Sequence, residues 1–113
     1  MDPETYWMYA REQLRRFLDE WEGQGTPKER LYRGWTYGPS TVMPRYLPDW
    51  LRRRFEKLWE AFDSVPPDPE HAEDEVRGQT LHSTIAAMSE DGVLALAAEI
   101  EDLYRTLEER ERR

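Results

Sequence analysis

Apolar side chains recur at intervals of three and four residues in three long stretches of the chain. The first stretch contains Trp7, Ala10, Leu14, Phe17 and Trp21. This spacing places them on one face of an α-helix, so we predict a helix here. Asp2 is a suitable N-cap and Pro3 suits the first helical position, while Gly23 is expected to end the helix.

Two later stretches repeat the pattern. The second contains Leu51, Phe55, Leu58 and Phe62. It predicts a helix that starts at Pro48 and ends near Asp63. The third contains Val93, Leu96, Ile100, Leu103 and Leu107. It predicts a last helix with Ser89 as its N-cap. The first and last helices match in length and period, so they can pack on each other or on a second copy. We therefore expect a homodimer.

Two weaker patterns predict further helices. Thr26-Pro27-Lys28-Glu29 resembles a capping box and opens a short helix, which we expect Gly34 to stop. Asp68 and Pro69 cap a helix that continues to about Met88, where apolar residues reappear. The chain is therefore predicted to be all-α, with residues 1–113 forming one four-helix bundle-like domain.

The stretch Leu31–Trp50 (LYRGWTYGPSTVMPRYLPDW) does not fit this scheme. Three prolines, at positions 39, 44 and 48, argue against a continuous helix. Disorder is not expected either, because disordered segments are poor in aromatic residues and this one is rich in them. We predict a long aromatic, proline-rich crossover between the first and second long helices.

The aromatic residues of this crossover allow two interpretations. They can form core, or they can form a recognition surface, since Trp, Tyr and Arg are enriched at binding hot spots. We expect a division, in which Trp35 and Trp50 are structural. The predicted partner-binding residues are Tyr32, Arg33, Tyr37, Arg45 and Tyr46.

Charge is unevenly distributed along the chain. Residues 1–62 contain eleven basic and ten acidic residues, a net charge of +1, whereas residues 63–113 contain five basic and fourteen acidic residues, a net charge of −9. The net charge of −8 disfavours direct nucleic-acid and membrane binding and suits a basic protein partner. It also leaves open an acidic inhibitor that occupies the basic groove of a nucleic-acid-handling enzyme.

Metal and cofactor sites find little support in the sequence. The chain has no cysteine, which excludes disulfides and thiolate ligands. His71 and Glu75 lie one helical turn apart, but two ligands are too few for a tight zinc site, and His82 is too far along the helix to join them. We expect no metal and no cofactor. The absence of a long apolar run or a signal-peptide pattern predicts a cytoplasmic protein.

One acidic pattern suggests an enzyme. Glu70-x-x-Glu73 is followed by Glu99-x-x-Asp102, within the string EIEDLY. The pattern resembles the magnesium-binding signature of the all-α MazG-type nucleotide pyrophosphohydrolases, and the resemblance covers about a third of the chain. It implies magnesium-dependent pyrophosphate release. However, the apolar face of the last helix places Asp102 about 150° from its centre, whereas a magnesium site between helices needs inward carboxylates.

These observations favour a non-enzymatic protein–protein interaction module, an adaptor or assembly subunit, that uses the aromatic and arginine residues of the crossover. The acidic inhibitor and the pyrophosphohydrolase are the alternatives. The first would bind through carboxylates with strong salt dependence, and the second would require magnesium.

Overall fold

The computed structural model describes residues 3–63 and 77–111, and every regular element in this part of the chain is helical. The five α-helices are α1 (Pro3–Trp21), α2 (Pro27–Tyr37), α3 (Asp49–Phe62), α4 (Arg77–Ala87) and α5 (Glu90–Glu111). Two short 3₁₀ helices, η1 (Pro39–Thr41) and η2 (Pro44–Tyr46), connect α2 to α3. The predicted all-α, bundle-like fold is confirmed.

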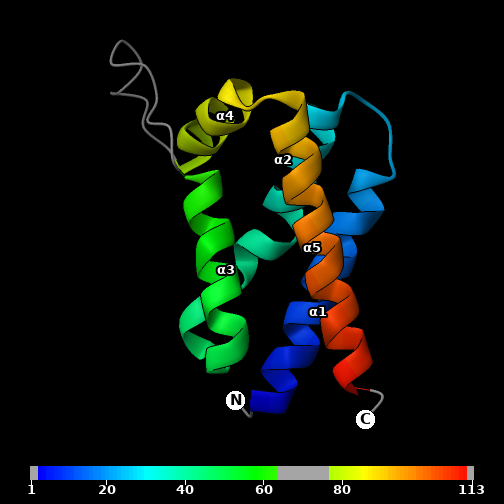
Figure 1. Ribbon diagram of the computed structural model, residues 1–113, viewed down its shortest axis with the longest axis vertical. Coiled ribbons are helices and arrows are strands. Elements are labelled where there is room, and N and C mark those ends of the chain that lie inside the picture. The colour runs from blue at the N-terminus through cyan, green and yellow to red at the C-terminus, as the bar shows by residue number, and fades with distance from the viewer. Residues whose placement is uncertain (1–2, 64–76, 112–113) are drawn as a thin grey trace.

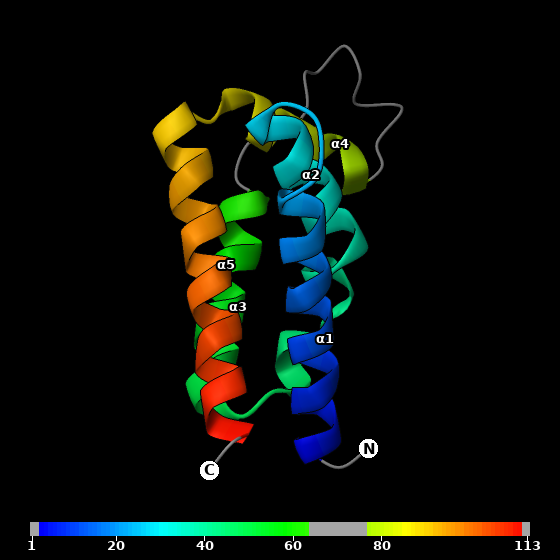
Figure 2. The ribbon, with the colours of Figure 1, turned by 90° about the vertical axis from the view of Figure 1, so that its right-hand side faces the viewer.

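The long helices run roughly along one axis of the molecule. In Figure 1, α1 and α3 rise from the lower end and α5 descends, so that both ends of the described chain lie at the lower end. Helix α4 crosses the opposite end, which we call the upper end. Figure 2 shows α1 and α5 antiparallel, and α2 turning back along α1.

One hydrophobic core joins all five helices. Its fully buried large side chains include Phe17, Phe55, Phe62, Leu14, Leu31, Leu47, Leu51, Ile100, Leu103 and Leu107. All three predicted apolar faces therefore point inward. Helices α1 and α5 contact each other within the chain, so their apolar faces are buried without a second copy. The homodimer stays a prediction, but the apolar faces of α1 and α5 do not support it, because they are already buried against each other.

Two of the helix starts show the capping contacts expected from the sequence. The Oγ1 of Thr26 accepts a hydrogen bond from the backbone N–H of Glu29 at 3.2 Å, with Pro27 at the first helical position. The Oγ of Ser89 accepts one from the N–H of Gly92 at 3.0 Å. Each contact satisfies a donor that the helix itself leaves free. The predicted cap at Asp2 and the one at Asp68 and Pro69 lie outside the described residues.

The prediction that Gly34 stops its helix is wrong. Helix α2 continues through Gly34 to Tyr37. A Cβ atom at Gly34 would lie 2.6 Å from Cδ2 of Phe17, so the missing side chain lets α2 approach α1 closely. A Cβ at Gly38 would lie 2.5 Å from the carbonyl oxygen of Gln13. The glycines beside Trp35 thus serve helix packing, and the conformational cost of Gly34 within the helix is about 1 kcal/mol.

The crossover is therefore shorter than predicted. Residues 31–37 belong to α2, and only residues 38–48 form a non-α connection between α2 and α3. Pro39 and Pro44 each begin a 3₁₀ helix, which suits their fixed φ angle. The side chains of Val42 and Leu47 are buried and fix the connection to the core.

Candidate functional site

Two of the predicted partner-binding residues, Tyr32 and Arg33, face different parts of the structure. Tyr32 is half-buried, and its ring lies edge-on to that of His82 in α4, 5.8 Å between centroids. The Nε of Arg33 donates to Glu20 of α1 at 3.3 Å, and its guanidinium also donates to the carbonyl of Gln24. Arg33 therefore ties α2 to α1 and to the turn between them.

The remaining predicted residues lie in or beside the connection between α2 and α3. Tyr37, at the C-terminal end of α2, is 62% exposed. Arg45 in η2 is exposed too. The side chain of Tyr46 lies outside the described part of the structure. The structure thus leaves Tyr37 and Arg45 accessible near the connection, and separates Tyr32 and Arg33 from them.

The two tryptophans that we expected to be structural both pack. Trp35 is buried and stacks on Phe62, with 4.1 Å between ring centroids. Trp50 is half-buried and lies edge-on to Trp7 at 5.4 Å. The guanidinium of Arg110 lies over the Trp50 ring, 3.7 Å from its centroid, in a cation–π contact. Trp50 thereby connects the start of α3 to α1 and α5.

A surface that the sequence did not reveal lies where α1 meets the connection. Among the described residues the exposed large hydrophobic side chains are Met8, Tyr9, Tyr37, Met43 and Leu94. All but Leu94 come from the first half of α1 or from positions 37–43. The hydroxyl of Tyr9 donates to Oγ1 of Thr41 at 3.0 Å and joins the two segments. We call Tyr9, Tyr37, Thr41 and Met43 the crossover face.

The periodic pattern gave no sign of Tyr9 or Met43 as exposed apolar residues. Tyr9 directly precedes the buried Ala10, and neighbouring helix positions are turned about 100° apart. The position of Tyr9 beside the connection depends on which segment packs on that side of α1. Only the tertiary structure shows that this segment is η1.

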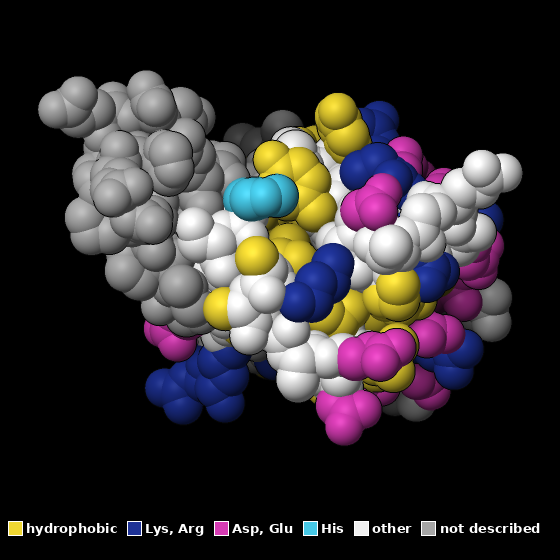
Figure 3. Space-filling view, turned by 90° about the horizontal axis from the view of Figure 1, so that it is seen from above, with side chains coloured by type: hydrophobic (Ala, Val, Ile, Leu, Met, Phe, Trp, Pro, Cys, Tyr) yellow, Lys and Arg dark blue, Asp and Glu magenta, His cyan; other side chains and the backbone are white. Residues whose placement is uncertain are grey.

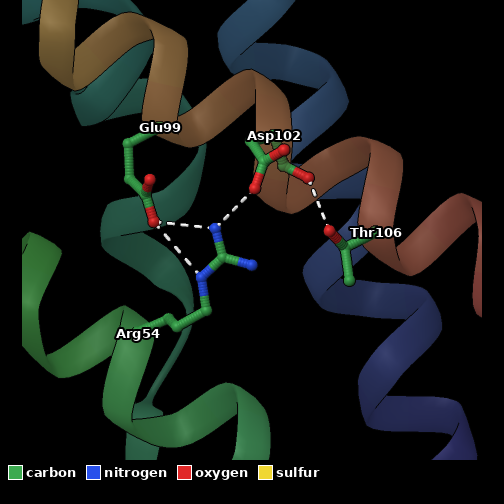
Figure 4. A network of polar contacts seen from close by, with 4 residues as sticks. All are labelled: Arg54, Glu99, Asp102 and Thr106. Atoms are coloured by element: carbon green, nitrogen blue, oxygen red, sulfur yellow. Dashed lines mark hydrogen bonds and ion pairs between the residues drawn. The ribbon is translucent and has the colours of Figure 1, made fainter.

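The acidic pair of the last helix is held by a cation. Nη2 of Arg54 in α3 lies 2.8 Å from Oε1 of Glu99 and 2.8 Å from Oδ2 of Asp102, both on α5 (Figure 4). Partial burial lowers the pKa of Arg54, but the hydrogen bonds to the two carboxylates outweigh it and leave that pKa above its ordinary value. Arg54 therefore stays charged and neutralises much of the pair.

This arrangement bears on the pyrophosphohydrolase resemblance. Asp102 is exposed, as the periodicity of α5 predicts, and its carboxylate pairs with the guanidinium of Arg54. It is therefore not one of the inward-facing carboxylates that a magnesium site between helices needs. Glu70 and Glu73 lie outside the described residues, as do His71 and Glu75. Within residues 3–63 and 77–111, no group of three or more His, Cys, Asp or Glu side chains is placed to hold a metal ion.

No helix in the described ranges is both long enough and apolar enough to cross a membrane. Comparison of the chain with protein-family models, with curated proteins and with solved structures finds no match. The crossover face and the charge distribution are therefore the features on which a function can be argued.

Proposed function

We propose that this protein is a non-enzymatic helical interaction module that binds a partner protein through the crossover face. One observation carries the proposal: three of the five exposed large hydrophobic residues in the described ranges, Tyr9, Tyr37 and Met43, belong to two segments that the Tyr9–Thr41 hydrogen bond joins. Isolated exposed apolar residues need no explanation, but grouped ones are typical of interaction sites.

The side chains of the crossover face suit recognition. Tyr presents a large apolar ring with a polar tip and loses little conformational entropy on binding, and it is enriched at hot spots. Met43 adds a flexible apolar side chain that adapts to a partner. Arg45, also exposed, lies two residues from Met43.

The backbone of the crossover face is held by hydrogen bonds within the chain. Oγ of Ser40 donates to the carbonyl of Thr36 and Oγ1 of Thr41 donates to the carbonyl of Gly38, both at 2.8 Å. Tyr9 then fixes Thr41 from α1. A surface ordered before binding loses less entropy when it docks. This supports direct recognition by Tyr37 and Met43.

A basic partner fits the charge of the chain. The net charge of −8 is concentrated in residues 63–113, away from the crossover face in sequence. Long-range attraction of this kind raises the association rate, and apolar contacts then set the dissociation rate. The partner is therefore expected to associate more slowly as salt is raised.

The proposal is tested by affinity capture from a lysate of the source organism with four matched baits. These are the wild-type chain, Tyr37→Ala, Met43→Ala and Leu94→Ala. Leu94 is 49% exposed on α5 and controls for the loss of an exposed apolar residue elsewhere. We expect a protein that the wild type and Leu94→Ala retain and that both crossover variants lose. Identical captures by all four baits contradict the proposal.

A further inference from the structure

A second surface runs along the outside of α5 and shares no residue with the crossover face. Helix α5 lies on the near side of the molecule in Figure 1 and at one edge in Figure 2, so one side of this helix faces away from the bundle. Exposed residues recur on that side at the spacing of one helical face. We call it the outer face of α5, and it consists of Asp91, Leu94, Ala95, Ala98, Asp102 and Arg105.

The middle of the outer face is apolar. Leu94 is 49% exposed, and the side chains of Ala95 and Ala98 beside it are exposed as well. Because alanine side chains are small, a second helix can approach this point closely, to about 8 Å between the two axes. The middle of the outer face therefore suits the packing of another helix.

The two ends of the outer face carry opposite charges. Asp91 lies in the first turn of α5, at the upper end of the molecule, where Figure 3 shows acidic side chains gathered at the lower right. Arg105 lies fourteen positions further, about 21 Å along the helix. Its side chain is 73% exposed, and its Nη2 donates to Glu101 at 2.6 Å. The other guanidinium nitrogens of Arg105 can still donate to a second carboxylate.

Asp91, Ala98 and Arg105 form a self-complementary pattern. Each is seven positions, close to two helical turns, from the next, so the three lie in one line along the outer face. The carboxylate of Asp102, between Ala98 and Arg105, is already paired with Arg54. When a second copy packs antiparallel with Ala98 against Ala98, Asp91 of each copy faces Arg105 of the other. A parallel pair would place like charges together, so charge favours the antiparallel pairing of two identical faces.

We propose that the outer face of α5 binds the same face of a second copy, with the two helices antiparallel and Ala98 at the two-fold axis. Two Asp91–Arg105 pairs then flank a centre made by Leu94, Ala95 and Ala98. A helix face of about 21 Å by 10 Å buries less than the roughly 1,200 Å² of a standard interface. The dimer is therefore weak, with an expected dissociation constant on the order of 100 µM.

Charge reversal at the two ends tests this arrangement. Asp91→Arg sets arginine against arginine at both ends of the dimer, and Arg105→Asp sets aspartate against aspartate. Each variant alone is expected to self-associate at least about tenfold more weakly than the wild type. An equimolar mixture of the two variants is expected to associate like the wild type, because a mixed pair restores both Asp–Arg contacts. Sedimentation equilibrium from well below to several-fold above the expected dissociation constant measures the association, at about 0.15 M salt to screen long-range repulsion between the acidic copies.

Arg53→Asp on α3 is the matched control. Arg53 is exposed on another helix, and its replacement changes the net charge as Arg105→Asp does, so this variant is expected to dimerise like the wild type. Ala98→Glu tests the centre separately, since it brings two carboxylates together at the axis and is expected to abolish the dimer. Circular dichroism checks that each variant is folded. A wild type that stays monomeric over the whole range overturns the proposal. A dimer that survives in both charge variants, or a mixture that stays monomeric, does so too.

Discussion

Gly34 is the residue at which the approach of α1 and α2 is decided. A β-carbon there would meet the ring of Phe17 at 2.6 and 2.9 Å and its carbonyl oxygen at 3.2 Å. Phe17 is fully buried, so its ring cannot swing away into solvent. The absence of a side chain at this one position is therefore part of the packing.

Gly34→Ala is expected to destabilise the protein by up to about 2 kcal/mol, because the overpacking cost of about 1–3 kcal/mol outweighs the helix propensity gain of about 1 kcal/mol. Chemical denaturation measures the change in the free energy of unfolding. Gly92→Ala is the matched control in α5, where a Cβ would meet only Oγ of Ser89, at 3.3 Å. It is expected to be neutral or stabilising. A stabilised Gly34→Ala variant would show that α2 does not pack on Phe17 as described.

Residue by residue, the sequence predicted what depends on local pattern. The burial of Leu14, Phe55 and Ile100 follows from spacing, and the roles of Thr26 and Ser89 follow from capping chemistry. The prediction for Gly34 was wrong because a glycine commonly ends a helix, and the sequence does not show that α1 packs against this position. The exposed positions of Tyr9 and Met43 depend on the path of η1 along α1, which no local rule contains.

At the scale of helices, Arg54 links α3 to α5. It bonds two carboxylates that lie three residues apart on α5, and without it these two charges would repel each other. Its pKa is raised above the ordinary arginine value, so the stability that its charge contributes is fully present at neutral pH and is lost only when strongly alkaline pH deprotonates it.

Arg54→Gln is expected to lower the free energy of unfolding by about 1 kcal/mol, since the partners are largely exposed and screened. Arg105→Gln is the control: Arg105 pairs with Glu101 within α5 and is expected to contribute at most about 0.5 kcal/mol. A double-mutant cycle of Arg54→Gln with Glu99→Gln isolates the pair. A coupling energy near zero would contradict the link.

Magnesium-dependent pyrophosphate release from nucleoside triphosphates that is lost in Glu99→Ala would show instead that these carboxylates are catalytic.

For whole elements, the three long helices were predicted within about two residues at the ends that can be compared, because their apolar faces are strongly periodic. Helix α2 was predicted to end at Gly34, whereas it continues to Tyr37. The sequence of its C-terminal half, a glycine followed by aromatic residues, also occurs in loops and does not indicate a helix by itself. Within the candidate site, Tyr37 and Arg45 are exposed, whereas Arg33 is engaged by Glu20, a partner thirteen positions away.

At the scale of the molecule, the chain is an acidic helical bundle whose long apolar faces are used within one chain. Self-association stays a prediction and would have to use exposed residues such as those of the outer face of α5. Sedimentation equilibrium at high micromolar concentration tests it: a homodimer predicts twice the chain mass of 13.6 kDa. A mass of one chain, unchanged over the concentration range, contradicts it.

Recognition through the crossover face is the central claim, and Tyr37 tests it most directly because it is the most exposed large hydrophobic residue of that face. The measurement is a titration of the captured partner with wild-type protein and with Tyr37→Ala, accompanied by a thermal melt of each. We predict that Tyr37→Ala weakens the complex by about 1–2 kcal/mol, roughly 5- to 30-fold in dissociation constant, and leaves the melting temperature within about 2 °C. Unchanged affinity, or a variant that unfolds, contradicts the claim.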